Sequence, residues 1–234
     1  MSTSPVDRAP CDTSAPLRLG LLVSRAGATL QALIDACQQN AFAASVELVL
    51  SNHKESPLLE RARGQGLTTR VLSEDAFDSA DAYETALVEA LQNRDVELVC
   101  LAGFSPTLGT KLVQAFPQRV LRMHSSLLPA FAGETPLSDA LAAGVRVTGC
   151  TLHFLDENCG VGCILLQSAL RVWSDDDEES LGIRISVLQQ KAFVAGVRLI
   201  AEGQVRVGDG RTQITGVPNT DQVLEWYPAA AAAS

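Results

Sequence analysis

The sequence is poor in aromatic residues, in histidine and in long apolar stretches. Aromatics make up 5% of the 234 residues and there are three histidines, so aliphatic side chains must fill the core. No apolar run approaches the roughly 18 residues that a membrane-spanning helix needs. Lys and Arg are not clustered and the net charge is -9. The sequence therefore argues against a surface for nucleic acid or for a membrane.

The two ends of the chain differ in composition from its middle. Residues 1–16 are rich in Ser, Pro, Asp and Thr and lack the apolar centre of a signal peptide, so we predict a disordered lead-in. Residues 217–234 finish in small residues, and we predict a frayed tail there. With 47% hydrophobic residues overall and no visible repeat or linker, the stretch 17–216 is predicted to form a single domain.

The six cysteines fall mostly inside apolar runs, which is typical of reduced thiols in a cytoplasmic protein. Cys159 and Cys163, with His153 upstream, suggest zinc. However, the C-x3-C spacing has no second pair of ligands. We therefore predict no metal site and a cytoplasmic location.

The first half of the domain alternates short apolar runs with segments of helical periodicity. We predict strands at 17–23, 46–50, 68–72, 96–102 and 120–124, and helices at 28–37, 58–62, 83–91 and 108–116. This alternation is typical of βαβ units, so the predicted fold class is α/β, with a doubly wound and mostly parallel sheet. In such sheets ligands bind at the carboxyl ends of the strands. The loops at 24–29, 104–108, 122–129 and 155–163 are the candidates for that site.

The second half of the domain has a different character. Two β-branched-rich segments at 145–154 and 164–173 are predicted to form an antiparallel pair. The acidic run 175–179 then precedes a long helix predicted at 179–202, and we interpret it as a solvated helix start, where the helix dipole favours negative charge. Residues 204–215 contain Gly-Asp-Gly and are predicted to form a hairpin.

His124 ends the predicted strand 120–124 and is the strongest candidate for chemistry. A histidine titrates near neutral pH, so at a strand end it is able to exchange protons with a substrate. A lone histidine is more often structural. Its role therefore depends on its neighbours.

Several of these motifs together resemble a known family, the folate-dependent glycinamide ribonucleotide formyltransferases of purine synthesis. The resemblance covers roughly Leu17 to Val207. It rests on Gly20–Ala36, Leu50-Ser51-Asn52, Phe77-Asp78-Ser79 with Ala82-Tyr83, Cys100–Phe104, His124 with Ser126-Leu127-Leu128-Pro129, Gly149–Phe154 and Ile164–Gln167. It implies one formyltransferase-like, Rossmann-like domain over 17–216 with an antiparallel β extension and a C-terminal hairpin.

The resemblance also implies a reaction. The family moves a formyl group from its co-substrate 10-formyltetrahydrofolate to the amine of glycinamide ribonucleotide. An asparagine and a histidine stabilise the tetrahedral oxyanion, and an aspartate assists the histidine and the proton transfer. The expected partners are these small molecules, in a monomer or homodimer, with no nucleic acid and no membrane.

The family's catalytic positions are only partly kept in this chain. The histidine is His124. The asparagine position is occupied by Arg122, and the aspartate position by Gly160. The nearby acidic and amide side chains of 156–158 (Asp156, Glu157 and Asn158) are candidates to replace the missing aspartate.

The family's binding positions have changed more than the apolar scaffold. The positions expected to bind the substrate are Gly27, Ala28, Thr29 and Gln189. The positions expected to bind folate are Ala80, Ser105, Pro106, Thr107 and Leu108. Most of these residues differ from the family pattern.

Three interpretations of this substitution pattern remain open. The first is a formyltransferase whose activity is weak or lost. The second is a pseudoenzyme that acts as a binding or regulatory protein. The third is a transferase that uses His124 with a changed substrate.

Overall fold

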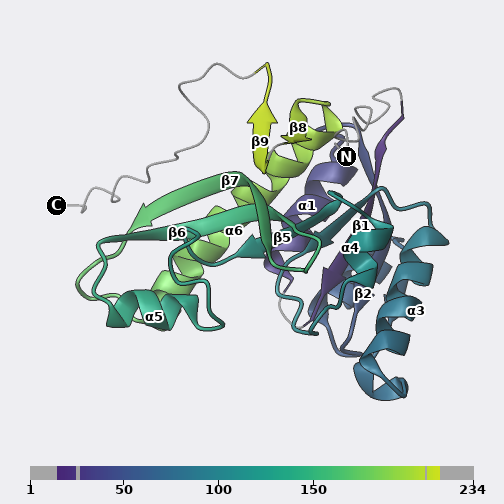
Figure 1. Ribbon diagram of the computed structural model, residues 1–234, viewed down its shortest axis with the longest axis horizontal. Coiled ribbons are helices and arrows are strands. Elements are labelled where there is room, and N and C mark those ends of the chain that lie inside the picture. The colour runs from purple at the N-terminus through teal and green to yellow at the C-terminus, as the bar shows by residue number, and fades with distance from the viewer. Residues whose placement is uncertain (1–14, 25–26, 209, 217–234) are drawn as a thin grey trace, which may run out of the picture.

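The computed structural model describes residues 15–24, 27–208 and 210–216. The predicted lead-in lies almost wholly outside these residues, and the predicted C-terminal tail lies wholly outside them. Seven strands form one sheet in the order β3-β2-β1-β4-β5-β6-β7, and β8 and β9 form a separate pair (Figure 1). Strands β1 to β5 are parallel, whereas β6 and β7 are antiparallel. The predicted fold class, with its antiparallel extension and hairpin, is therefore confirmed.

The strands of the large sheet are β1 (Leu17–Val23), β2 (Ala44–Ser51), β3 (Thr69–Val71), β4 (Leu98–Leu101), β5 (Val120–His124), β6 (Val147–Leu155) and β7 (Val161–Arg171). The hairpin consists of β8 (Val205–Gly208) and β9 (Arg211–Ile214). The helices are α1 (Ala28–Gln38), α2 (Pro57–Gly64), α3 (Ala80–Gln92), α4 (Lys111–Ala115), α5 (Pro136–Ala142) and α6 (Glu178–Ala201), with a short 3-10 helix at Glu74–Ala76.

The sheet is covered on both faces, and each face has its own apolar core. Buried side chains of α1, α2 and α6 pack on one face, together with Leu121 and Met123 of β5. Buried side chains of α3 and α4 pack on the other face, together with Val120. Alternate residues of β5 therefore enter different cores, as the two-residue period of a strand requires. Figure 1 shows α3 on the outside of one face, and β6, β7 and α5 extending to the opposite end of the molecule.

Several predicted boundaries were wrong by a few residues. The strand predicted at 96–102 is shorter and extends over Leu98–Leu101, because Val96 packs against α3 as part of the turn before it. The helix predicted at 108–116 begins only at Lys111. The segment before it lacks helical geometry, although Leu108 still packs against the second core.

Helix α5 was not predicted, since no element was assigned to its residues. It begins with Pro136 at its first position, where the missing N–H of proline costs no helical hydrogen bond. Ala140 is fully buried, and Leu137 and Leu141 pack against the first core. A Thr-Pro pair before an apolar pattern was the available sequence signal.

The acidic run before α6 is a helix start, as predicted, but only part of it is solvated. Asp177 is the N-cap and forms a capping box with Ser180. The Asp176 side chain is buried and pairs with the Arg184 guanidinium, whose carbon lies 3.9 Å from the centre of the Trp173 ring. The prediction of a fully solvated run is therefore wrong at Asp176.

A search of the described helices for a membrane-spanning candidate found none with the necessary length and apolarity.

Candidate active site

A cavity of about 880 Å³ lies where the carboxyl ends of β1, β4 and β5 meet the loops that follow them. The remaining walls come from the segment before α5, the loop between β6 and β7, and one side of α6. Among the residues that line it are Gly27, Ala28, Thr29, Ser105, Arg122, His124, Ser125, Glu134, His153, Cys159, Gly160, Glu178, Ser186 and Gln189. The carboxyl-edge location agrees with the position expected for a ligand in a sheet of this kind.

Hydrogen bonds fix the loops after β1 and β4 to each other. The Ser24 hydroxyl accepts from the Ser105 backbone N–H at 2.7 Å and lies 2.8 Å from the Ser105 hydroxyl. The Ser51 hydroxyl donates to the Ser24 carbonyl at 2.9 Å. Because Ser24 and Ser51 are buried, these contacts hold two walls of the cavity in a single arrangement.

His124 is half-buried at the end of β5, and its ring is oriented by one backbone group. Its Nε2 lies 3.0 Å from the Phe131 carbonyl oxygen. A carbonyl oxygen only accepts hydrogen bonds, so Nε2 carries a hydrogen and donates it. The neutral ring then has Nδ1 as its acceptor, and the protonated ring donates from both nitrogens.

The loop that follows His124 is held by a buried polar network. Thr151 lies opposite His124 in the β5–β6 register. Its hydroxyl donates to the Ser126 carbonyl at 2.7 Å and accepts from the Leu128 N–H at 3.0 Å. The Gln167 amide donates to the Leu128 carbonyl at 2.9 Å and to the Thr151 hydroxyl at 3.1 Å. The backbone that carries His124 is therefore rigidly supported.

Gln189 brings helix α6 to the same site. It was predicted as a substrate-binding position, and it lines the cavity. Its amide donates to the Ser125 hydroxyl at 2.8 Å, directly beside His124. Ser186 and Glu178 on the same helix also line the cavity.

Arg122, the residue at the family's asparagine position, lies beside a second histidine. Arg122 is directly opposite His153 in the β5–β6 register, and both line the cavity. His153 is 2% exposed, and its Nδ1 lies 2.9 Å from the Phe154 carbonyl. Arg122, His124 and His153 therefore form one group on the same side of β5 and β6.

Gly160, at the family's aspartate position, also lines the cavity. The loop that carries it is folded by Asp156, whose Oδ1 accepts from the Asn158 N–H at 2.9 Å and the Gly160 N–H at 2.7 Å. The Cys159 thiol donates to the Gly109 carbonyl at 2.6 Å and so fastens this loop to the segment before α4.

The structure brings together some of the predicted site residues but not all of them. All three catalytic positions, all four substrate-binding positions and Ser105 line the cavity. Ala80 is instead the exposed first residue of α3. The other predicted folate positions, Pro106 to Leu108, lie between β4 and α4 outside the cavity lining.

Sequence reasoning missed Glu134, Glu178 and Ser186 as cavity residues. Glu134 lies two residues before the unpredicted helix α5, so its position could not be inferred without that helix. Glu178 and Ser186 lie on α6, and Gln189 on the same helix was the available signal. Within the described ranges, no group of three or more His, Cys, Asp and Glu side chains is arranged to hold a metal ion.

Burial lowers the pKa of His153, and the charges of Arg122 and His124 lower it further against the opposing effects of the Phe154 carbonyl and Asp156. In the unfolded chain the pKa of this histidine is about 6.5. Below that pH the unfolded state binds more protons, so the stability contributed by neutral His153 is lost as pH falls through 6.5 towards the folded pKa.

We therefore expect the free energy of unfolding to decrease between pH 6.5 and 5, with His153 contributing up to about 1.4 kcal/mol per pH unit. Urea denaturation of the wild type and of His153→Gln at several pH values measures this contribution. Equal pH slopes in the two proteins would show that His153 is not responsible.

Comparison with known proteins agrees with this fold. The family model described as formyl transferase matches residues 17–197. The phosphoribosylglycinamide formyltransferase of Escherichia coli is 30% identical over 200 residues, which are 86% of this chain and 94% of that protein. The trifunctional purine biosynthetic protein adenosine-3 of Bos taurus is 37% identical over 192 residues, which are 82% of this chain and 19% of that protein. The chain therefore spans between 14% and 19% of the length of the trifunctional relatives.

A solved structure gives the same result. Glycinamide ribonucleotide transformylase 1 from Symbiobacterium toebii superimposes with a TM-score of 0.82 at 38% identity, covering 85% of this chain and 94% of that one. The family match covers most of the described sheet, including every strand that borders the cavity. This chain therefore belongs to the formyl transferase family, which includes the phosphoribosylglycinamide formyltransferases.

Proposed function

We propose that this chain transfers a formyl group from 10-formyltetrahydrofolate to the amine of a small acceptor in the cytoplasm, with glycinamide ribonucleotide as the first candidate. The observation that carries this proposal is the retained His124, held in a fixed orientation at the edge of a cavity of about 880 Å³. This volume lies within the range of roughly 300–1,000 Å³ typical of small-molecule sites. Ser105, Gly160 and Gln189 would contact the two substrates.

In the proposed reaction the acceptor nitrogen attacks the formyl carbon and forms a new C–N bond. The formyl oxygen becomes an oxyanion, towards which protonated His124 and Arg122 direct hydrogen-bond donors. The bond between the formyl carbon and N10 of the folate then breaks, and the proton lost by the acceptor amine reaches N10. The products are a formamide and tetrahydrofolate, so atoms and charge balance.

Arg122 determines how well this chemistry proceeds. Its guanidinium is always charged and presents several N–H donors, so it is able to replace a neutral amide as an oxyanion donor. Its geometry differs from that of an asparagine side chain, and loss of one well-placed oxyanion donor costs about 10²–10³ in rate. We therefore propose an activity below that of family members with the intact site.

A second candidate function is formyl transfer to a different acceptor. Two carboxylates, Glu134 and Glu178, line the cavity, whereas Arg122 is the one Lys or Arg among its described lining residues. Carboxylates repel a phosphate and favour a cation. This charge pattern supports an acceptor with a positively charged group in addition to its reacting amine.

The test is direct formyl transfer by the purified chain. The protein is incubated with 10-formyltetrahydrofolate and either glycinamide ribonucleotide or a panel of phosphate-free diamines, and mass spectrometry detects the formamide. We expect a formylated product above the no-protein background. Product only with the diamines selects the second candidate. Absence of any product, with no folate binding in calorimetry, would contradict both and leave the binding-protein interpretation.

A further inference from the structure

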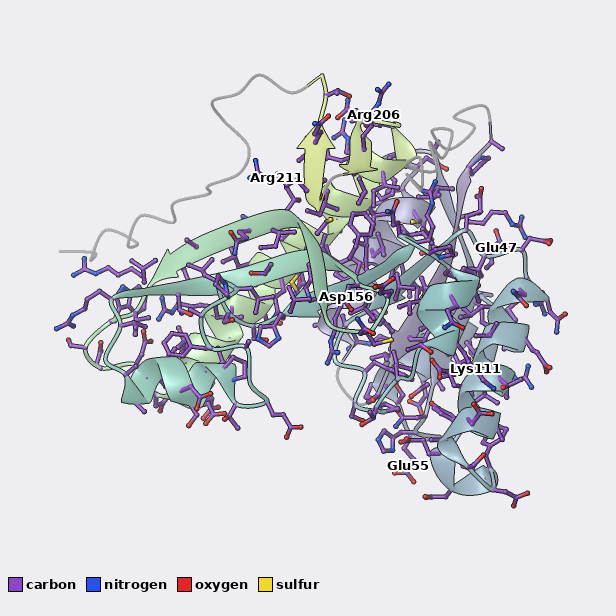
Figure 2. The ribbon with its side chains drawn as sticks, viewed as in Figure 1. Glu47, Glu55, Lys111, Asp156, Arg206 and Arg211 are labelled. Atoms are coloured by element: carbon purple, nitrogen blue, oxygen red, sulfur yellow. The ribbon has the colours of Figure 1, made fainter. Side chains whose placement is uncertain are left out.

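In the loop between β6 and β7, the carboxylate of Asp156 lies close to the backbone of Gly160. A Cβ atom added at Gly160 would lie 3.0 Å from Oδ2 and 3.3 Å from Oδ1 of Asp156. The Asp156 carboxylate therefore lies in close contact with the position where a side chain at residue 160 would begin. Figure 2 shows Asp156 near the middle of the molecule, beside the turn that joins β6 and β7.

The carboxylate is held in that place by the loop itself. Oδ1 accepts the backbone N–H groups of Asn158 and Gly160, and the Asp156 N–H donates to the Gly160 carbonyl at 3.2 Å. Backbone N–H donors fix the orientation of a carboxylate. Oδ1 is thus occupied by the loop, and Oδ2 lies next to Gly160 in the cavity wall.

Among its described lining residues, the cavity next to the Asp156 loop has one positively charged residue, Arg122. Asp156 is hydrogen-bonded to Gly160, and Gly160 lines the same cavity as Arg122. Arg122, His124 and His153 line the cavity. An attacking amine also becomes positive before it loses its proton. A nearby carboxylate stabilises such positive charge, most strongly where water is excluded.

We propose that Asp156 is the positioning carboxylate of this formyl-transfer site. Asp156 lies next to Gly160, just outside the cavity lining, and it acts through the neighbouring side chains of Arg122, His124 and His153. Its negative charge balances the positive charge that develops on the acceptor amine during attack. This inference rests on the proposed function, because its catalytic effect requires the reaction. The position of the carboxylate beside the histidines can be tested without the reaction.

The first experiment separates the charge of Asp156 from its support of the loop. Asp156→Asn keeps an oxygen that accepts the two loop N–H groups but removes the charge. We expect kcat to fall by about 10²-fold, the lower end of the contribution of a positioned proton-transfer group, with KM for both substrates within about twofold, since the variant leaves the cavity-lining groups unchanged. Glu157→Gln, which neutralises the exposed neighbouring carboxylate, is the matched control and should keep wild-type kcat.

The second experiment moves the carboxylate. The double variant Asp156→Asn/Gly160→Asp restores a carboxylate at residue 160, whose backbone lies beside the original carboxylate. We expect kcat of the double variant to be at least about tenfold higher than kcat of Asp156→Asn. Unchanged kcat in Asp156→Asn would overturn the inference. A loss that the double variant does not recover would also overturn it, because the role of Asp156 would then be limited to folding its loop.

A third measurement does not depend on turnover. Nitrogen chemical shifts of the histidine rings, recorded at one pH, should move for His124 and His153 in Asp156→Asn and stay unchanged in Glu157→Gln. Unchanged shifts in Asp156→Asn would overturn the inference even if the wild type were active. A wild type without turnover would instead contradict the proposed function, so the two failures are distinguishable.

Discussion

Replacing His124 with alanine should lower kcat for formyl transfer by about 10²- to 10³-fold, the usual cost of removing an oxyanion-stabilising group. His124 is the family histidine that this chain retains, and it stands at the carboxyl end of β5 in the cavity wall. Within the part of the chain that the structure describes, its side chain makes one hydrogen bond, to the Phe131 carbonyl. Removal of that bond should therefore cost only about 1 kcal/mol of stability. Single-turnover formyl transfer, with urea denaturation in parallel, measures both quantities.

His53→Ala is the matched control for this variant. His53 is partly buried after β2 and is not among the residues that line the cavity. It should therefore keep wild-type kcat. Full activity in His124→Ala would show that the reaction does not use this histidine and would contradict the proposed mechanism.

The largest expected effect on folding comes from Gly149→Ala. Gly149 lies in β6, where an added Cβ would be 1.9 Å from the Ser168 carbonyl oxygen of β7 and 2.9 Å from Leu127. The first of these atoms is backbone within a paired strand, so it cannot move aside without disturbing the β6–β7 register. We expect a loss of more than about 3 kcal/mol in the free energy of unfolding, at or beyond the usual range for overpacking. Urea denaturation measures this loss.

Gly208→Ala is the corresponding control in the hairpin. A Cβ added at Gly208 meets no atom within 4 Å, so this variant should stay within about 0.5 kcal/mol of wild type. If Gly149→Ala were equally stable, β6 and β7 would have to be more widely spaced around Gly149 than the structure shows.

The elements that were predicted best from sequence are those whose local residue pattern is enough to define them. Strands β1 and β5 have the predicted bounds, because each is a short, mostly buried segment that is followed directly by a serine and a loop. Helix α5 was missed because it is short, and burial of Ala140 against the rest of the fold, rather than a long apolar stripe, supports it. Local pattern alone does not report such tertiary support.

The candidate site was predicted in outline but not in its contacts. Sequence placed His124 and Arg122 at a strand end and grouped the right loops at one edge of the sheet. The pairing of Ser24 with Ser105 joins two loops that are distant in the chain, and no local signal indicates it. The same holds for Asp156, since its position relative to Gly160 depends on how the loop closes. Sequence offered Asp156, Glu157 and Asn158 as equal candidates for the missing carboxylate, and the three-dimensional arrangement selects Asp156 because it lies beside Gly160.

The dual location of helix α6 has a thermodynamic consequence. One side of this helix packs in the core beneath the sheet, with Leu188 and Phe193 buried, and it packs closely against α1. The same helix presents Gln189 to the cavity, which Thr29 of α1 also lines. Unfolding of either helix therefore removes the ligand site and the core together. By linkage, any ligand that fills the cavity stabilises the whole domain in proportion to its affinity and concentration.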